Sequence, residues 1–427
     1  MGRAATVTAS GPSGSRRTSL AAAVLAATLA AAPALAEQPR ELGVAAHSGA
    51  AAPMLMTFQR PNRHMEITGV AEDADGVLWI TGFSEDREQP AGVGYLAAIA
   101  RDGGLQIEHE TALPGHRVTQ FWWPAPLADG SVAVAVALDP FSARPDGAVA
   151  ILSRDGQVLN QVLLTDLGLA GGDIVHVELY PDRDLAVTGS ARLGPQVSGA
   201  MAARLRPDLS AVWVATEGAR DRGYTLSAYA STVLRDGSLV AIGTATRPEG
   251  ADGYGWLARF DRTGRVLWRQ WLTGGMAELL EDAAQIYGNW VAESPGGDIA
   301  YLQSSYDEFG RPLTHTLVRR SLAGHIVSQI PLTFADELEL TTMGATRDGD
   351  VIVAGAAGTG AVPIIARIGS GGSVRWSQRL EELPGGFVWG VAETTDGTIV
   401  AVGAYFPYGR TTGSGWVVRL GSDGSRP

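Results

Sequence analysis

A glycine that recurs at a fixed distance after a turn constrains the fold of this chain more than any other feature. In four copies an Asp-Gly pair starts an apolar run that reaches another glycine seven residues after the Asp. The Asp and glycine pairs are Asp75 and Gly82, Asp236 and Gly243, Asp348 and Gly355, and Asp396 and Gly403.

Three further copies depart from this pattern. Asp182 and Gly189 keep the spacing with Arg183 in the turn, Asp129-Gly130 leads to Val136, and Gly296-Gly297 replaces the Asp. The turns follow one another at intervals of about 50 residues, a period typical of repeat architectures.

The chemistry of each copy predicts a β-hairpin. Asp-Gly tolerates the positive φ angles of a tight two-residue connection. The following runs, such as 238–243 and 398–403, are apolar at nearly every position, as in strands that are covered on both faces. Because the sequence shows almost no helical periodicity, we expect sheets to stack on sheets.

A second hairpin follows in each copy and is clearest over 255–268. Arg204, Arg319, Arg367 and Arg419 share the register of Arg259, and Trp213 and Trp376 share that of Trp268. Four strands in about 50 residues are the size of one propeller blade. An Arg or Trp repeated in several blades is expected to support the blades and to lock neighbouring ones together.

The sequence therefore predicts an all-β, seven-bladed β-propeller with four antiparallel strands per blade. The last copy lacks a fourth strand, and the segment 53–58 looks like a strand without a partner, so pairing it with the last blade would close the ring and remove exposed edges. The predicted ranges are an export signal peptide at 1–36, a flexible segment at 37–51, and a propeller at 52–427 with blades at 63–112, 117–166, 173–218, 225–274, 288–334, 338–383, and 386–427 plus 52–60.

The N-terminus has the pattern of an export signal. Arg16 and Arg17 precede a mildly apolar stretch at 20–32, and small residues at 34–36 predict cleavage before Glu37. Residues 15–20 resemble a twin-arginine signal but have Ser19 where Phe is usual, so the twin-arginine and general routes stay equally open. We expect a periplasmic or extracellular protein.

The composition excludes several functions. The chain has no cysteine, and all 33 basic residues are arginine, so disulfides, thiolate nucleophiles and lysine Schiff bases are excluded. A net charge of −12 disfavours nucleic acid and anionic lipid as partners. Beyond the signal, no apolar segment is long enough to insert into a membrane, and we expect a monomer.

The stretch from Ser238 to Gly275 resembles a repeat of secreted bacterial propellers of unassigned function. It is more distantly similar to the quinoprotein-like (PQQ-like) propeller repeat through 261–264 and Trp268. This resemblance implies a propeller fold but no particular activity. Quinoprotein enzymes also need ligands for calcium and the quinone, which we cannot match in this sequence.

Aromatic residues on the innermost strands are candidates for ligand binding at the mouth of the central channel. Three stand seven residues before the turn Asp, and three occupy the next register: Trp122, Tyr229 and Trp389, and then Trp123, His176 and Trp290. Such rings could stack against a sugar or a flat ring. Packing between adjacent blades is the alternative interpretation, because successive residues of a strand face opposite sides.

Acidic residues gather on loops of the same face and form a candidate patch for a cation or a basic partner. These residues are Glu278, Glu281, Asp282, Asp307, Glu308, Asp336 and Glu337. In an acidic protein the alternative is an ordinary solvated surface.

The sequence contains no catalytic signature. It lacks a G-x-S-x-G elbow, and no two histidines have the spacing of a helical zinc site. We therefore expect an exported non-catalytic binding or scaffold propeller that uses its longer-loop face for a protein or carbohydrate partner, without a cofactor. The alternative is a carbohydrate-active hydrolase or lyase, or a quinone-dependent oxidoreductase, on the same face. Calcium and PQQ are the weaker cofactor alternatives.

Overall fold

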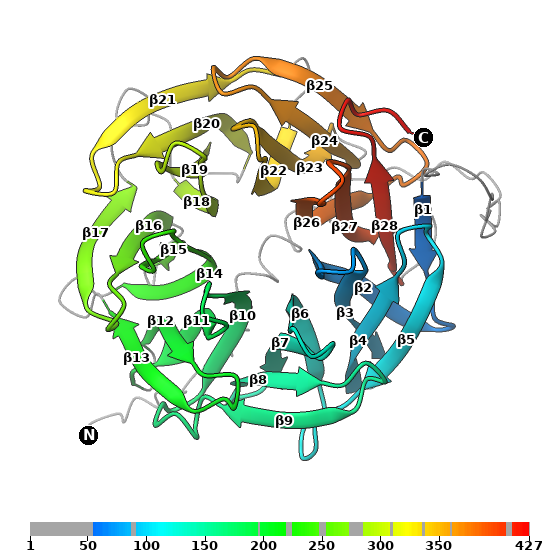
Figure 1. Cartoon of the computed structure of the whole chain (residues 1–427), viewed down its shortest axis with the longest axis vertical. Coiled ribbons are helices and arrows are strands. Elements are labelled where there is room, and N and C mark those ends of the chain that lie inside the picture. The colour runs from blue at the N-terminus through cyan, green and yellow to red at the C-terminus, as the bar shows by residue number, and fades with distance from the viewer. Residues whose placement is uncertain are drawn as a thin grey trace, which may run out of the picture.

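The described part of the chain forms a ring of β-sheets around a central channel (Figure 1). The structure is a computed structural model that describes residues 54–86, 91–194, 197–218, 224–246, 253–272, 285–307, 311–334, 338–358, 361–406 and 412–426. These residues form 28 strands and no helix. The arrangement confirms a seven-bladed β-propeller with four antiparallel strands per blade.

The strands follow one another from the channel outward in each blade. Blade 1 contains β2 (Arg63–Glu72), β3 (Leu78–Asp86), β4 (Ala91–Ile99) and β5 (Leu105–Thr111). Blade 2 contains β6 (Thr119–Pro126), β7 (Val132–Leu138), β8 (Asp146–Leu152) and β9 (Val158–Leu163). Blade 3 contains β10 (Gly172–Leu179), β11 (Leu185–Arg192), β12 (Ser198–Leu205) and β13 (Ala211–Glu217).

The second half of the ring repeats this order. Blade 4 contains β14 (Thr225–Val233), β15 (Leu239–Thr246), β16 (Gly253–Phe260) and β17 (Val266–Leu272). Blade 5 contains β18 (Gln285–Glu293), β19 (Ile299–Tyr306), β20 (Pro312–Arg320) and β21 (Ile326–Leu332). Blade 6 contains β22 (Leu338–Ala345), β23 (Val351–Ala357), β24 (Val362–Ile368) and β25 (Val374–Arg379). Blade 7 contains β26 (Gly386–Glu393), β27 (Ile399–Tyr405), β28 (Ser414–Leu420) and β1 (Met54–Phe58).

The two ends of the chain close the ring in blade 7. Strand β1 pairs antiparallel with β28 in a register that sets Met54 opposite Arg419 and Phe58 opposite Gly415. The N-terminal strand is therefore the outermost strand of the last blade, and the closure confirms the prediction made from the missing fourth strand. A second link joins blades 4 and 5, where a short parallel pairing between β16 and β18 merges the two blades into one eight-stranded sheet.

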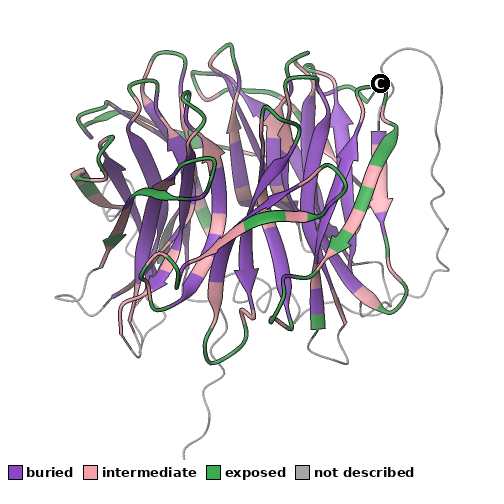
Figure 2. Cartoon of the chain, turned by 60° about the horizontal axis from the view of Figure 1, so that its bottom comes forward, coloured by how far each residue is buried: buried purple, intermediate pink, exposed green. Residues whose placement is uncertain are grey.

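The core lies in layers between neighbouring blades. Every residue of β7, β23 and β27 is buried, because both faces of these middle strands are covered by adjacent blades. The outermost strands, such as β5, alternate between exposed and half-buried residues. Figure 2 shows buried residues throughout the strands and exposed ones in the turns and along the outer strands.

The recurring turns are one residue longer than the sequence suggested. In blade 1, Asp73 and Val77 form the closing pair, and Gly76 donates its amide to the Asp73 carbonyl oxygen. Three residues therefore connect the strands, with Gly76 in the left-handed region at φ 77°. A type I turn followed by a left-handed residue is the usual three-residue hairpin. The difference arises because Asp-Gly suits the last two positions of a three-residue loop as well as it suits both positions of a two-residue turn.

The repeated Arg and Trp of the outer hairpins tie each blade to the next. The carbonyl oxygen of Leu322 in blade 5 accepts hydrogen bonds from Arg259 Nη1 at 2.5 Å and from Trp268 Nε1 at 2.9 Å, both in blade 4. Ser422 O in blade 7 accepts the same two bonds from Arg367 and Trp376 of blade 6. These contacts confirm the supporting role predicted for the repeated residues.

Each inner strand carries a β-bulge at a similar depth of the channel, and the recurring glycine lies opposite it. In blade 1 the bulge leaves Thr68 unpaired, and Gly82 pairs with Ile67 next to it. A Cβ at Gly82 would lie 2.0 Å from the carbonyl oxygen of Glu66, so no other residue fits there without displacement of the backbone. The corresponding distances at the other recurring glycines are 1.8–2.0 Å, for Gly189, Gly243, Gly355 and Gly403.

The two blades that lack this glycine have different bulges. Val136 takes its place in blade 2, where the bulge leaves both Trp122 and Trp123 unpaired. In blade 5 Gln303 occupies the equivalent position, and the bulge moves one residue along to Trp290, which adopts a left-handed φ of 60°. The altered bulges re-aim large aromatic residues at the channel.

We predict that Gly355→Ala destabilises the protein by more than about 2 kcal/mol, because the new methyl group would collide with a backbone carbonyl. The measurement is the free energy of unfolding from denaturant titration. Gly371→Ala is the matched control, because no atom lies within 4 Å of a Cβ built there. A Gly355→Ala protein as stable as this control would contradict the role given to the glycine.

Candidate functional site

Four of the predicted inner-strand aromatics, Trp122, Trp123, Trp290 and Trp389, meet across the channel. The rings of Trp122 in blade 2 and Trp389 in blade 7 have centroids 6.3 Å apart, although blade 1 separates the two blades. Trp123 in blade 2 approaches Trp290 in blade 5 to 4.8 Å. Rings of non-adjacent blades can meet only across the channel, so these rings project into it. Trp122, Trp123 and Trp290 also pack against the cores between adjacent blades, so both interpretations that the sequence left open apply.

One group of rings, Trp123, His176 and Trp290, forms a plug across the middle of the channel. His176 lies 5.2 Å from Trp123 and 5.6 Å from Trp290 between ring centroids, so the three rings contact one another. Trp123 also approaches blade 7. Its ring lies so close to Gly390 that a Cβ at this position would be 3.1 Å from the ring. The plug thus connects blades 2, 3, 5 and 7.

The plug is uncharged at neutral pH. His176 Nδ1 forms a 3.1 Å hydrogen bond with Ser231 Oγ, and burial lowers the pKa of His176 to about 3. Two residues along the same strand, burial raises the pKa of Glu178 to about 8, against the effect of the Val233 amide, which donates to its carboxylate at 3.0 Å. Both shifts have the same cause, since a low-dielectric environment disfavours the charged form.

A second group of rings forms what we call the aromatic wall, between the plug and the end of the channel where the inner strands begin. It comprises six residues from blades 1, 2 and 7: His64, Phe83, Trp122, Phe387, Trp389 and Phe406. Each ring contacts the next in a closed cycle with centroid distances of 5.0–6.4 Å. Phe83 and His64 are buried, whereas the other four rings are half-buried.

A buried carboxylate stands behind the wall. Glu66 is 4 % exposed and accepts hydrogen bonds from His64 Nε2 at 2.5 Å and Trp389 Nε1 at 2.8 Å. The Gly413 amide donates to His64 Nδ1 at 2.9 Å, which leaves the proton of the imidazole on Nε2. This chain of hydrogen bonds ties blade 1 to blade 7.

Two further carboxyl groups lie at the register of Glu66 on other inner strands. Burial raises the pKa of Asp173 in blade 3 to about 6, against a weak hydrogen bond from Ser190. Burial also raises the pKa of Glu339 in blade 6. Neither residue contacts the aromatic wall through an interaction recorded among the described residues.

The remaining predicted site residues stand apart from these groups. Tyr229 projects from a bulge but bonds through its hydroxyl to Thr244 of its own blade. Asp307 is buried and binds the backbone amide and the guanidinium of Arg311. The other residues of the predicted acidic patch lie outside the described part of the chain: Glu278, Glu281, Asp282, Glu308, Asp336 and Glu337.

Sequence reasoning missed four rings of the wall, His64, Phe83, Phe387 and Phe406, and also Glu66 behind it. Glu66 and Phe387 share one register, two residues before the bulge, and this periodicity was the available signal. Phe83 lies within β3 directly after the recurring Gly82, at a position that is not aromatic in the other blades, and Phe406 lies just beyond the end of β27.

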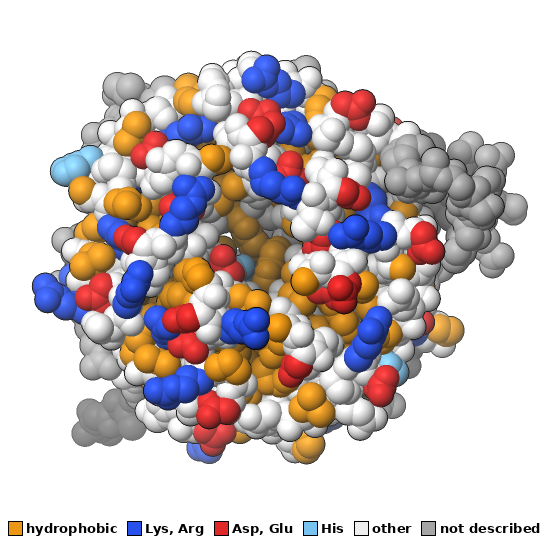
Figure 3. Space-filling view, viewed as in Figure 1, with side chains coloured by type: hydrophobic (Ala, Val, Ile, Leu, Met, Phe, Trp, Pro, Cys, Tyr) orange, Lys and Arg blue, Asp and Glu red, His pale blue; other side chains and the backbone are white. Residues whose placement is uncertain are grey.

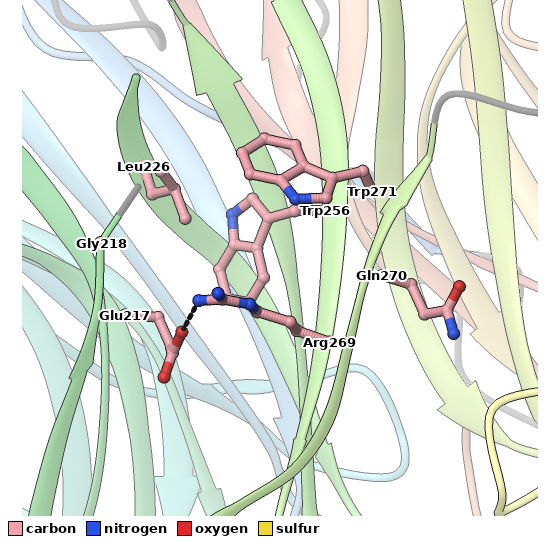
Figure 4. A pocket seen from close by; sticks show the side chains of 7 residues that line it. All are labelled: Glu217, Gly218, Leu226, Trp256, Arg269, Gln270 and Trp271. Atoms are coloured by element: carbon pink, nitrogen blue, oxygen red, sulfur yellow. Dashed lines mark hydrogen bonds and ion pairs between the residues drawn. The ribbon is translucent and has the colours of Figure 1, made fainter. Parts of the chain in front are cut away.

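Outside the channel, two hollows lie near the rim of the ring. A cavity of about 10 Å³ between blades 3 and 4 has room for one water at most (Figure 4). Trp256 and Trp271 line it, and an ion pair between Arg269 and Glu217 crosses its edge. An open groove of about 520 Å³ lies between β5 and β9. By contrast, Figure 3 shows the centre of the ring hollowed, with hydrophobic side chains gathered around it.

Neither a metal site nor a membrane-spanning helix is found where the structure is described. No three His, Asp or Glu side chains there are grouped closely enough to hold a metal ion. Among the same residues, no helix is long and apolar enough to cross a membrane.

No protein-family model and no curated protein matches this sequence. Several solved structures are similar in fold. A catalytically inactive virginiamycin B lyase from Staphylococcus aureus, solved with quinupristin, superposes with a TM-score of 0.51 at 13% identity over 86% of this chain and 99% of that one. A protein of unknown function from Dyadobacter fermentans superposes with a TM-score of 0.51 at 12% identity, over 85% of this chain and 97% of that one. YCF48 from Cyanidioschyzon merolae superposes with a TM-score of 0.50 at 12% identity, over 87% of this chain and 99% of that one. At such identities the likeness establishes the propeller fold alone.

We predict that the buried neutral state of His176 makes stability depend on pH. Its folded pKa of about 3 lies below the ordinary value of 6.5, so its contribution is fully present above pH 6.5 and is lost as the pH falls toward 3. The urea midpoint of the native protein should therefore fall more steeply between pH 6.5 and 4 than that of His176→Gln.

The exposed His325 provides the control, and His325→Gln should follow the native profile. Glu178 titrates in all three proteins and cancels from the comparison. Parallel profiles for the native protein and His176→Gln would show that His176 is not buried in its neutral form.

Proposed function

We propose that this chain is an exported, non-catalytic binding propeller that holds a small ligand against the aromatic wall in its channel. The observation that carries this proposal is that the half-buried rings of Trp122, Phe387, Trp389 and Phe406 converge in the channel from two non-adjacent blades. Half-buried rings present apolar faces that a flat or compact ligand can cover.

Export is proposed from the sequence. The basic pair Arg16-Arg17, the apolar stretch at 20–32 and the small residues at 34–36 support it, and they lie outside the described residues. The resemblance of 238–275 to the repeat of secreted bacterial propellers, and more distantly to the PQQ-like repeat, supports the same assignment. A propeller of this kind would act in the periplasm or outside the cell.

The chemistry of the channel favours binding over catalysis. Both ring nitrogens of His64 and both carboxylate oxygens of Glu66 are engaged in hydrogen bonds within the protein. His176 has a pKa of about 3, far from the range in which a side chain accepts a proton efficiently near neutral pH. None of these groups is poised for proton transfer.

A hydrolase or lyase is the second candidate, because Asp173 has a pKa raised to about 6, as a general acid requires. Asp173→Asn would abolish any such activity on polysaccharide fragments. Quinone-dependent oxidation has no comparable observation in its favour among the described residues.

We predict that a ligand of the wall stabilises the native protein and requires Trp389. The panel consists of polysaccharide fragments, small aromatic compounds, quaternary amines, calcium and pyrroloquinoline quinone, measured by thermal unfolding. A ligand at 100 times its dissociation constant adds ~2.7 kcal/mol of stability if it binds only the folded state. Isothermal titration should then show binding lost in Trp389→Ala.

Trp376→Ala is the control, because Trp376 lies on the outer hairpin and bonds to Ser422 of blade 7. It should retain the ligand despite its own loss of stability. If no member of the panel binds, or if Trp389→Ala binds as tightly as the native protein, the wall is not a ligand site and a protein partner becomes the leading interpretation.

A further inference from the structure

The aromatic wall combines electron-rich rings with a buried negative charge. Glu66 lies behind the wall, where its carboxylate accepts hydrogen bonds from two neutral donors, the imidazole of His64 and the indole of Trp389. We infer that the wall selects an organic cation of the quaternary or tertiary ammonium class. This inference rests on the proposed function and specifies the ligand for the same site.

The charge of Glu66 is not neutralised by a basic side chain in the described structure. His64 is the sole titratable partner among its recorded contacts, and the Gly413 amide that donates to His64 Nδ1 requires that nitrogen to be unprotonated. The imidazole is therefore neutral. A carboxylate with neutral partners in a low-dielectric environment attracts a cation over a longer distance than it would in water.

The hydrogen bond to Glu66 also prepares the ring of Trp389. Its indole N–H donates to the carboxylate at 2.8 Å, which increases the electron density of the ring and strengthens its attraction for a cation. Phe387 stands at 84° to this indole with a centroid distance of 5.0 Å, and Phe406 follows at 6.0 Å from Phe387. Several half-buried aromatic residues in mutual contact are the surroundings in which quaternary ammonium groups are bound.

The polar groups near the wall argue against a hydroxyl-rich ligand. A sugar needs several side-chain donors and acceptors beside the stacking ring. Within the wall the indole N–H of Trp122 is buried and has no hydrogen-bond partner among the described residues, whereas other polar groups nearby are engaged. Thr68 Oγ1 bonds to the carbonyl oxygens of Phe121 and Trp122 at 2.8 and 2.9 Å, and Gln120 donates to Glu85. A quaternary ammonium group has no N–H or O–H to pair, so its binding does not depend on such partners.

The plug is less suited to this ligand. Its rings cover one another, with 4.8 Å between the centroids of Trp123 and Trp290, and its one titratable ring, His176, is neutral. No recorded contact places a carboxylate against these three rings. Among the described residues, a carboxylate hydrogen-bonded to one of the channel rings is therefore found at the wall and not at the plug.

The test compares choline with 3,3-dimethyl-1-butanol, its uncharged isostere, by isothermal titration or ligand-detected NMR on the full chain. Since the two probes have the same shape, a difference in affinity measures the charge. We expect choline to bind about tenfold more tightly, the ratio that a cation–π contact of ordinary strength produces. Equal binding of the two probes, or no binding of choline, overturns the inference.

Two variants locate the effect. Glu66→Gln removes the charge and should lower the affinity for choline severalfold without changing that for the isostere. If Glu66→Gln fails to fold, Trp389→Phe takes its place, because it keeps an aromatic ring but removes the hydrogen bond to Glu66. It should lower the affinity for choline without changing that for the isostere. Trp376→Phe, far from the channel, should leave both affinities unchanged. Native affinity for choline in Glu66→Gln or Trp389→Phe contradicts the inference.

The outcomes separate this inference from the proposed function. Binding of a neutral ring compound that depends on Trp389, together with no binding of choline, would retain the wall as a ligand site and reject its selectivity for cations. Failure of choline and of every neutral compound in the panel would reject the ligand site itself.

Discussion

The structure of the channel depends on one close contact, the approach of an inner-strand carbonyl oxygen to the backbone of a glycine on the second strand. In blade 4 a Cβ at Gly243 would lie 1.8 Å from the Ser227 oxygen. That approach lets the inner strand bulge, and the bulge detaches one residue from the ladder, such as Tyr229 or Trp389. The glycine that defines the repeat in the sequence is therefore the glycine that shapes the channel in the structure.

The two blades without this glycine explain how the channel is plugged. Val136 and Gln303 each carry a side chain where the other blades need open space, so the bulge widens in blade 2 and shifts by one residue in blade 5. As a result Trp123 and Trp290 meet across the channel. The two copies that lack the recurring glycine in the sequence, blades 2 and 5, therefore together produce the contact between these two rings. Non-glycine φ values near +60°, such as that of Trp290, persist where surrounding packing holds them.

The sequence predicted the ring because its signals are local. A turn, an apolar run and an Arg in fixed register report neighbouring residues, and each blade repeats them. The site was predicted only in part, because the contact between Trp122 and Trp389 depends on the direction in which the bulge of each blade aims its side chain into the channel. That direction is set by blades far apart in the sequence. The register of Glu66 in the repeat was readable, but its role was not, since it becomes distinctive only when Trp389 of the last blade closes on it.

Closure of the ring and the chemistry of the wall are consequently linked. The Gly413 amide, His64, Glu66 and Trp389 form one chain of hydrogen bonds from blade 7 through blade 1 and back to blade 7. The junction that seals the propeller also fixes the tautomer of His64 and holds beside the rings a carboxylate that no basic side chain of the described residues neutralises. Burying such a charge is costly unless it is well solvated by donors. A carboxylate accepts from His64 and Trp389 at once, whereas an amide would oppose one of these donors with its own N–H groups. The same charge therefore serves the closure of the ring and, on the inference above, the attraction of a cation.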